Sequence, residues 1–167
     1  MNNLMNPKYP EGRNLFQDKN ILITAAAGSG IGFSTAKRFL EEGANIFISD
    51  VHKGRLDEAI DALRNLNLGK VNGCLCNVTN DEEIDSMFKD AIACYSNLNG
   101  VINNAGLGGE SILEDMTNDA WDLVMDVTLN GAMKIMRAAI PVLKDTQGVI
   151  VNNASVLGWR AQAGQSH

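Results

Sequence analysis

The chain has 167 residues, 45% of them hydrophobic, which is typical of one globular domain with its own core. Its 14 basic and 20 acidic residues give a formal net charge of -6, which argues against nucleic acid or an anionic membrane surface as a partner. The first thirty residues show no secretory signal, and no apolar run approaches the roughly 18 residues that span a bilayer. We therefore expect a cytoplasmic protein without a membrane partner.

The chain in order predicts an arm followed by one α/β domain. Residues 1–19 contain prolines and asparagines without periodicity, which predicts a flexible N-terminal arm. From residue 20 onward, short apolar runs alternate with helical patterns that end near residues 42, 66, 95 and 143. The expected strands are 21–23, 45–49, 71–76, 101–102 and 149–151. This alternation predicts a Rossmann-type, doubly wound parallel sheet over residues 20–167, with five strands and four helices.

The ends of the helices carry their own signals. Thr79 and Glu82 have the spacing of a capping box before the third helix. Gly43 and Gly69 stand where left-handed residues would end the first two helices.

The three cysteines predict neither a disulfide framework nor a metal site. Cys74 and Cys76 lie two apart on a predicted strand, where they point the same way and form no CxxC pair. With only two histidines in the chain, a His-based metal site is also not expected. We expect buried free thiols and no bound metal.

A glycine-rich turn follows the first predicted strand and opens the first helix. Gly28, Gly30 and Gly32 would let the backbone approach a pyrophosphate at the positive end of the helix dipole. The alternative is a tight connection without a ligand, but three glycines in five residues carry an entropic cost that a plain connection does not require. The candidate cofactor contacts in this turn are Thr24, Ala26, Gly28, Ser29, Gly30, Ile31 and Gly32.

Asp50 ends the second predicted strand, near the spacing at which an acid binds the adenosine ribose hydroxyls. A carboxylate at this point repels a 2'-phosphate, so NAD is favoured over NADP as the cofactor. Lys53 and Arg55 leave NADP open, because either side chain could reach a phosphate; as solvated charges on a surface helix they would have no such role.

Several motifs in a fixed order resemble one family. They are the glycine turn, "NV" at 77–78, "NNAG" at 103–106, "WDLVMDVTLNG" at 121–131 and "VIVNNASVLG" at 149–158. Through them residues 20–167 resemble the classical short-chain dehydrogenases/reductases. Within that family the chain is similar to bacterial 3-oxoacyl reductases and to steroid-ring-degrading dehydrogenases that act on hydroxylated acyl-CoA intermediates.

The resemblance implies further cofactor contacts. Asn77 stands where the family usually has an aspartate that touches the adenine ring, and Val78 lies beside it. Asn103, Ala105 and Gly106 belong to the motif that braces the central sheet and passes under the cofactor.

Two positions depart from the family pattern. The usual glycine after Thr24 is replaced by Ala25, so the turn is either one residue longer or shifted. The family's catalytic asparagine, which helps to hold a water in a proton relay, falls on Thr128. Asn130 lies about 200° around the helix from that position and cannot take its place.

Ser155 follows the last predicted strand and matches the serine that hydrogen-bonds the substrate oxygen in the family. In relatives a tyrosine exchanges the proton and a lysine lowers the pKa of that tyrosine, because a serine alone is a poor general acid or base. The family spacing places this tyrosine just beyond His167. Tyr9, in the arm, and Tyr95, at the end of a helix, are not credible substitutes, and His167 is expected at a frayed terminus.

We therefore expect a C-terminally truncated fold that lacks its last strands and helices. The strand at 149–151 would form an exposed edge, and marginal stability and aggregation would follow. Full-length relatives are homo-oligomers that use the helix at about 118–143.

Two functions remain open. The first is an NAD(P)-dependent oxidoreductase acting on a small-molecule secondary alcohol or ketone, such as a hydroxyacyl-CoA or a steroid-derived substrate, with this chain inactive alone. The second is a non-catalytic dinucleotide-binding module. Hydride transfer distinguishes them.

Overall fold

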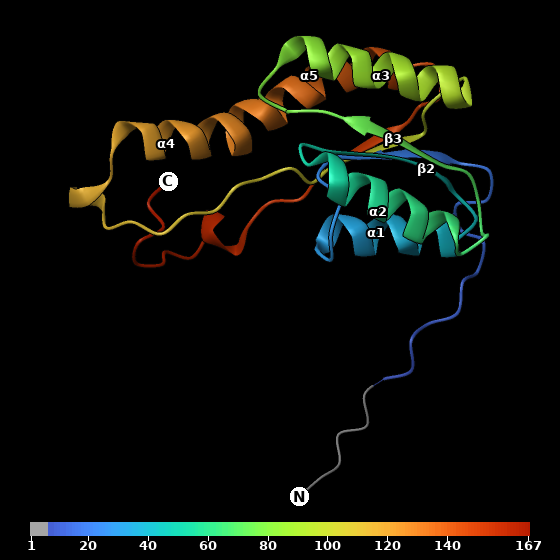
Figure 1. Cartoon of the computed structure of the whole chain (residues 1–167), viewed down its shortest axis with the longest axis horizontal. Helices are drawn as coiled ribbons and strands as arrows, with labels where there is room; N and C mark the ends of the chain where they lie inside the picture. The colour runs from blue at the N-terminus through green and yellow to red at the C-terminus, as the bar shows by residue number, and fades with distance from the viewer. Residues whose placement is uncertain (1–6) are drawn as a thin grey trace, which may run out of the picture.

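The computed structural model describes residues 7–167, so residues 1–6 of the expected arm, with their three asparagines, lie outside the described residues. Five strands form one parallel sheet in the order β3-β2-β1-β4-β5 (Figure 1). They are β1 (Asn20–Ile23), β2 (Asn45–Asp50), β3 (Val71–Leu75), β4 (Gly100–Asn103) and β5 (Val149–Asn152). The winding direction reverses between β1 and β4, and this switch point is where open α/β sheets bind ligands.

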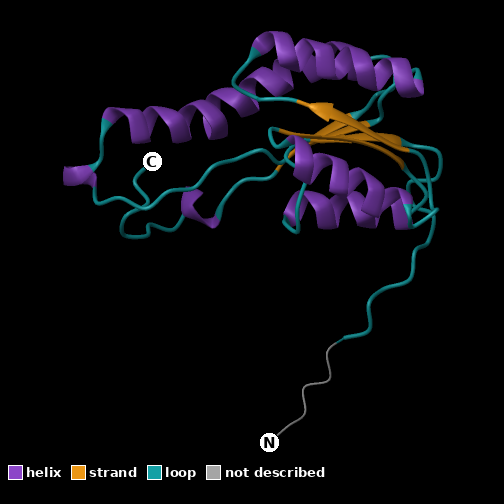
Figure 2. Cartoon of the chain, in the orientation of Figure 1, coloured by secondary structure: helices purple, strands orange, loops and turns teal. Residues whose placement is uncertain are grey.

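Helices cover both faces of the sheet, which confirms the predicted doubly wound fold. They are α1 (Ile31–Glu41), α2 (Lys53–Arg64), α3 (Asp81–Tyr95), α4 (Asn118–Met125) and α5 (Gly131–Leu143). Helices α1 and α2 lie on one face, and α3 and α5 on the other (Figure 2). A π-helical turn, η2 (Asp126–Asn130), joins α4 to α5, so the long helix predicted at 118–143 is one helical run with an internal irregularity. Short 3-10 turns, η1 (Leu113–Asp115) and η3 (Val156–Gly158), complete the elements.

The central strands are buried because both of their faces pack against helices. Ile21 and Ile23 contact the core under α1 and α2, whereas Leu22, between them, contacts the core under α3 and α5. Each strand therefore needs apolar side chains on both faces, which is why these strands appear in the sequence as continuous apolar runs.

The third helix is capped differently from the prediction. Its N-cap is Asn80, whose side chain accepts hydrogen bonds from the backbone N–H groups of Glu82 and Glu83 at 3.0 and 3.2 Å. The predicted capping box of Thr79 and Glu82 is wrong by one residue, because asparagine caps a helix at least as well as threonine. Glu83 is the acid that reaches back, since its carboxylate accepts from the Asn77 N–H at 2.7 Å.

One of the two predicted helix-ending glycines is confirmed. Gly43 follows α1 with φ +88°, in the left-handed region. Gly69 has no such φ; the left-handed residue after α2 is Asn67, with φ 55°. Gly69 is instead required by close packing, because a Cβ there would lie 2.5 Å from the carbonyl oxygen of Ala44.

The thiols are free, and their burial differs. Cys76 is buried, Cys74 is half-buried, and both contact the core under α3, which confirms that they point the same way. Burial raises the pKa of Cys74 to about 11 and that of Cys76 to about 12. Cys94 is exposed, so the prediction of a buried thiol is wrong there: it lies on the solvent side of α3, among the polar positions of that helix.

Residues 9–19, called the strap below, contain no helix or strand. They precede α1 in the chain and contact its C-terminal end. The Phe16 N–H donates to the carbonyl oxygen of Glu42 at 2.9 Å, and the rings of Phe16 and Phe39 stack edge to face with centroids 4.6 Å apart. The strap is thus attached to the domain at several points, and the flexibility of the arm stays a prediction.

Strand β5 lies at one edge of the sheet, with Val149 61% and Val151 50% exposed.

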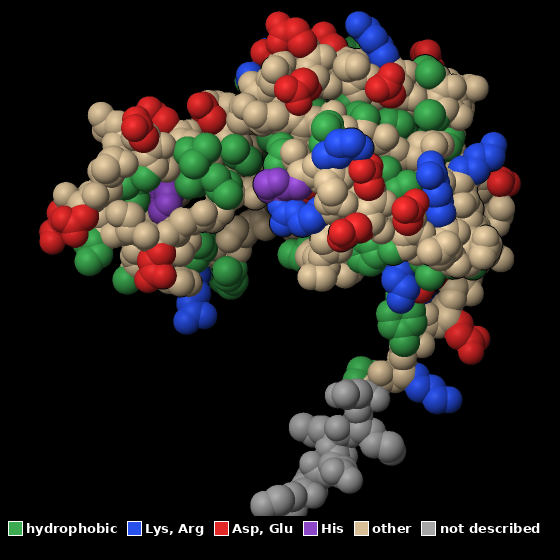
Figure 3. All heavy atoms as spheres, in the orientation of Figure 1, with side chains coloured by type: hydrophobic (Ala, Val, Ile, Leu, Met, Phe, Trp, Pro, Cys, Tyr) green, Lys and Arg blue, Asp and Glu red, His purple; other side chains and the backbone are tan. Residues whose placement is uncertain are grey.

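On the face shown in Figure 3, Lys and Arg side chains are interspersed with Asp and Glu side chains. Within residues 7–167, no helix is both long and apolar enough to cross a bilayer.

Candidate functional site

Two neighbouring cavities open at the carboxyl ends of the strands. The first, of about 440 Å³, is lined by residues that follow β1, β2, β3 and β4, among them Ala25, Asp50, Arg55, Asn77, Val78 and Ala105. The second, of about 590 Å³, is lined by Asn104, Thr128, Asn153, Ser155 and His167, among others. Gly106 and Leu107 line both cavities, so one backbone segment is their common wall.

The glycine turn is open where the predicted ligand would approach. Gly28 has φ +78°, and at both Gly28 and Gly30 an added Cβ would meet no atom within 4 Å. At Gly32 a Cβ would lie 2.4 Å from the Ala25 carbonyl oxygen, so this glycine serves the packing of α1 against the turn. Ser29, Gly30 and Ile31 line an open depression at the first turn of α1.

Asp50 joins the glycine turn to the end of β2. Its carboxylate accepts from the Ala27 N–H at 3.3 Å and from the His52 N–H at 3.1 Å. Lys53 forms an ion pair with Asp57, with Nζ 2.7 Å from Oδ2, so the charge of Lys53 has a partner within the chain. Arg55 lines the first cavity, as Asp50 does.

Thr24 anchors the segment that forms the common wall. Its Oγ1 accepts from the N–H groups of Asn104 and Ala105 at 2.9 and 3.0 Å. The Asn104 Nδ2 in turn donates to the carbonyl oxygens of Thr24 and Ala25. Asn104 is a site residue that the pattern of the sequence did not predict, although it stands within the "NNAG" motif at 103–106.

Ala26 and Asn103 are buried, and neither lines either cavity. The Ala26 N–H donates to the carbonyl oxygen of Ser49, and the Asn103 side chain donates to Ala132 O and Asn152 Oδ1. Both support the sheet beneath the site; direct contact with a cofactor stays a prediction for them.

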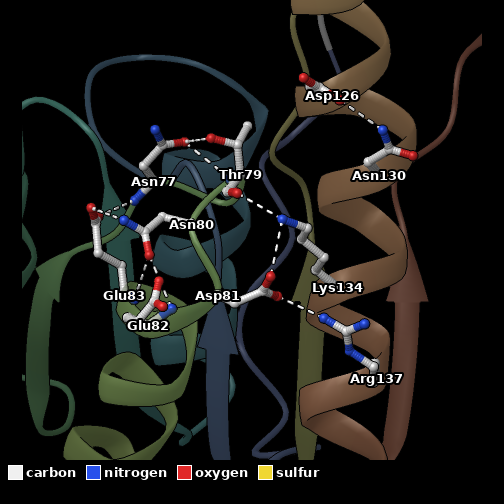
Figure 4. Close-up of polar contacts among 10 residues, drawn as sticks. All are labelled: Asn77, Thr79, Asn80, Asp81, Glu82, Glu83, Asp126, Asn130, Lys134 and Arg137. Carbon is white, nitrogen blue, oxygen red and sulfur yellow. Dashed lines mark hydrogen bonds and ion pairs between the residues drawn. The ribbon is translucent and has the colours of Figure 1, made fainter.

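Asn77 lies at the end of β3, and its side chain has a fixed orientation. Its Oδ1 accepts from the Thr79 N–H at 3.1 Å and from the Thr79 hydroxyl at 3.0 Å (Figure 4). Val78 is buried and contributes an apolar wall to the first cavity.

Thr128 lies in the π-helical turn and holds the common wall. Its Oγ1 accepts from the Leu107 N–H at 3.1 Å and lies 3.2 Å from the Leu107 carbonyl oxygen, to which it donates. Asn130 points elsewhere: its Nδ2 donates to Asp126 Oδ1 at 2.7 Å (Figure 4), and it lines neither cavity. Asn130 therefore lies away from the wall that Thr128 contacts, as its position around the helix predicted.

Ser155 lines the second cavity and is exposed. Its Oγ accepts from the Leu157 N–H at 3.2 Å, which leaves the hydroxyl hydrogen free to donate. His167 is half-buried against Gly109 and lines the same cavity; the expected fraying of this residue stays a prediction.

The two tyrosines lie outside both cavities. The Tyr95 hydroxyl donates to the Ile46 carbonyl oxygen at 2.7 Å, and burial raises its pKa to about 12. The Tyr9 hydroxyl donates to Glu41 at 2.5 Å. Within residues 7–167, no group of three or more His, Cys, Asp or Glu side chains is arranged to hold a metal ion.

Comparison with known proteins matches a family model described as short chain dehydrogenase over residues 19–167. A relative from Mycobacterium tuberculosis, named (5R,7aS)-5-hydroxy-7a-methyl-1-oxo-2,3,5,6,7,7a-hexahydro-1H-indene-carboxyl-CoA reductase, is 47% identical over 100% of this chain and 64% of its own. A crystal structure of a short chain dehydrogenase from Mycobacterium smegmatis is 48% identical with a TM-score of 0.92, covering 96% of this chain and 68% of that one.

A short chain dehydrogenase/reductase from Burkholderia phymatum, solved in complex with NAD, is 28% identical with a TM-score of 0.85, covering 90% of this chain and 53% of that one. The chain spans 61% to 64% of the length of the first curated relatives that it matches.

Proposed function

This chain belongs to the short-chain dehydrogenase family, and we propose that it binds NAD for hydride transfer to or from a secondary alcohol or ketone. The observation that carries the proposal is the common wall of Gly106 and Leu107. A dinucleotide that extends from the first cavity along this wall would present its nicotinamide to the second cavity, where Ser155 donates a hydrogen bond. When bound, the nicotinamide would supply hydride transfer. The residues of the chain would bind the dinucleotide and orient it toward the substrate.

The glycine turn and the first cavity together fit the adenosine diphosphate half of a dinucleotide. Gly28 and Gly30 leave open space for a pyrophosphate at the N-terminus of α1, where the helix dipole favours an anion. Asp50 can still accept hydrogen bonds from ribose hydroxyls. Each of its carboxylate oxygens accepts one bond within the chain and can accept a second. We propose NAD rather than NADP, since a 2'-phosphate beside Asp50 would be repelled. NADP is the alternative, favoured by the position of Arg55 in the same cavity.

A binding experiment tests this proposal. NAD should raise the melting temperature of the chain, and more than NADP does at equal concentration. Asp50→Ala should weaken NAD binding by about tenfold or more, because hydrogen bonds to a charged acceptor contribute roughly 1.5–3 kcal/mol each. Asp61→Ala, an exposed position on α2, is the matched control and should bind NAD normally. No shift at millimolar NAD, with Asp50→Ala behaving identically, would remove the case for a cofactor site.

For the substrate we propose a hydroxyacyl-CoA or a steroid-derived ketone, because the relative from Mycobacterium tuberculosis is named as an indene-carboxyl-CoA reductase. By the family spacing, the tyrosine and lysine follow residue 167. The proposal for residues 1–167 is therefore dinucleotide binding, and hydride transfer is proposed for a protein that also contains those two residues.

In such a protein, Ser155→Ala should lower the rate of NADH formation by about a hundredfold, as loss of one donor to a developing oxyanion does. Ser86→Ala, exposed on α3, should leave the rate unchanged. The alternative, a non-catalytic dinucleotide-binding module, predicts NAD binding with no turnover of any secondary alcohol.

A further inference from the structure

We propose that Asn153 is a positioning residue for the reaction. Its side chain ties the segment that carries Ser155 to the segment that forms the common wall of the two cavities. The tie fixes the separation between Ser155 and a nicotinamide bound along that wall. This inference rests on the proposed function, because that function places the nicotinamide on the wall.

The tie is a hydrogen bond between two side-chain amides. The Asn153 Nδ2 donates to the Asn104 Oδ1 at 2.9 Å. The Asn104 amide is itself fixed, because its Nδ2 donates to the carbonyl oxygens of Thr24 and Ala25 at 3.1 and 3.0 Å. Carbonyl oxygens only accept, so the Asn104 oxygen is the atom left for Asn153, and residue 153 must supply the donor. An apolar side chain or a carboxylate at this position cannot form the bond.

The tie lies where β4 and β5 separate. The backbone N–H of Asn153 donates to the Asn103 carbonyl oxygen at 2.9 Å, just beyond the paired ends of the two strands. Past this point the chain after β4 forms residues 104–107, which include the wall, and the chain after β5 forms residues 153–158. Both segments leave the sheet on the same side as α4 (Figure 1). Within the described part of the chain, the bond from Asn153 to Asn104 is the one hydrogen bond that joins them.

The other hydrogen bonds around Ser155 are local. Its Oγ accepts from the Leu157 N–H at 3.2 Å, and its carbonyl oxygen accepts from the Gly158 N–H at 3.0 Å. These bonds close η3 on itself, and among residues 7–167 none joins residues 154–158 to another helix or strand. Ser155 and Val156 are exposed, so little packing holds the turn in place. The place of Ser155 relative to the wall therefore depends on Asn153.

This separation should control the rate rather than the binding of the cofactor. Hydride transfer needs the reacting atoms about 3–3.5 Å apart, and a misplacement of about 1 Å can cost about a hundredfold in rate. The proposed NAD contacts come from the glycine turn, Asp50 and the wall, and Thr24 and Thr128 hold the wall without help from Asn153. Loss of the tie should therefore lower kcat and leave the affinity for NAD unchanged.

Nitrogen-15 relaxation of the chain 1–167 tests the tie directly. In the wild type the backbone of residues 155–158 should show order parameters of about 0.85, and in Asn153→Leu, which has a similar size but no amide, below about 0.6. Asn153→Ala removes the same donor without adding an apolar side chain and should give the same result. Asn118→Leu, exposed at the start of α4 and outside the second cavity, should keep the wild-type values. Unchanged order parameters in both Asn153 variants overturn the proposal.

The kinetic consequence is measured in a longer protein that also contains the expected tyrosine and lysine. There Asn153→Leu should lower kcat by about tenfold or more without changing the KM for NAD, whereas Asn118→Leu should match the wild type in both. An unchanged kcat, or an affinity for NAD that falls as much as the rate, overturns the role of Asn153 and leaves the cofactor site standing. Failure of the wild-type chain to bind NAD in a calorimetric titration overturns the proposed function and this inference together.

Discussion

Thr128, one of the positions expected to depart from the family pattern, has a physical role in the structure. Its hydroxyl holds both backbone groups of Leu107, in the wall common to the two cavities. Thr128→Val keeps the shape and removes both bonds, so the Leu107 amide should exchange with solvent about fivefold faster, as expected for roughly 1 kcal/mol. Hydrogen exchange followed by NMR measures this. In Thr128→Ser, which keeps the hydroxyl, the Leu107 amide should exchange as in the wild type. Equal exchange rates in all three proteins would show that the two hydrogen bonds from Thr128 do not protect Leu107.

At the scale of elements, one buried carboxylate makes several of the contacts between the strap and the end of α1. Glu42 is 3% exposed and accepts from the N–H groups of Arg13, at 2.7 Å, and Leu15, at 3.2 Å, and from the Arg38 guanidinium. The Arg13 N–H, with Leu15 and Arg38, lowers the pKa of Glu42 below its ordinary value of 4.5, against the opposite effect of burial.

A lowered folded-state pKa fixes the sign of the pH dependence. The unfolded chain binds this proton near pH 4.5 and the folded chain only below it, so the stabilisation is complete above 4.5 and is lost as the pH falls through the folded value. Urea unfolding at a series of pH values should show Glu42→Gln less stable at neutral pH, with a flatter loss in acid. Glu58→Gln, exposed on α2, should leave the profile as in the wild type. Parallel profiles for Glu42→Gln and the wild type would contradict this role.

At the scale of the whole molecule, β5 is the point of weakness. Its outer backbone groups and the exposed Val149 and Val151 form an unprotected sheet edge in the described structure, and such edges pair with other chains. We expect association that increases with protein concentration in sedimentation velocity, and Val151→Lys should reduce it. Leu68→Lys, which places the same charge at an exposed apolar residue outside the sheet, should not. A monomer at all concentrations with a sharp, cooperative melt would be inconsistent with this view.

The sheet was predictable because burial on two faces leaves a continuous apolar signature, as in β1 and β2. Helix ends were less predictable. Thr79, Asn80 and Asn67 all have side chains or backbone preferences that suit a cap or a turn, and only the packed chain selects among them. The sequence of the strap has no periodicity, so it does not predict that Glu42 accepts hydrogen bonds from the strap.

The sequence by itself determined the order of strands and helices, the glycine turn and Asp50 beyond it, because these depend on residue type at local spacing. Only the tertiary structure decided that Thr128 binds both backbone groups of Leu107 and that the Asn77 side-chain oxygen accepts from Thr79. The hydrogen bonds between Thr128 and Leu107 join residues that are distant in sequence. The orientation of the Asn77 amide depends on which atoms of Thr79 the folded backbone places beside it. Neither is encoded in the identity of a single residue.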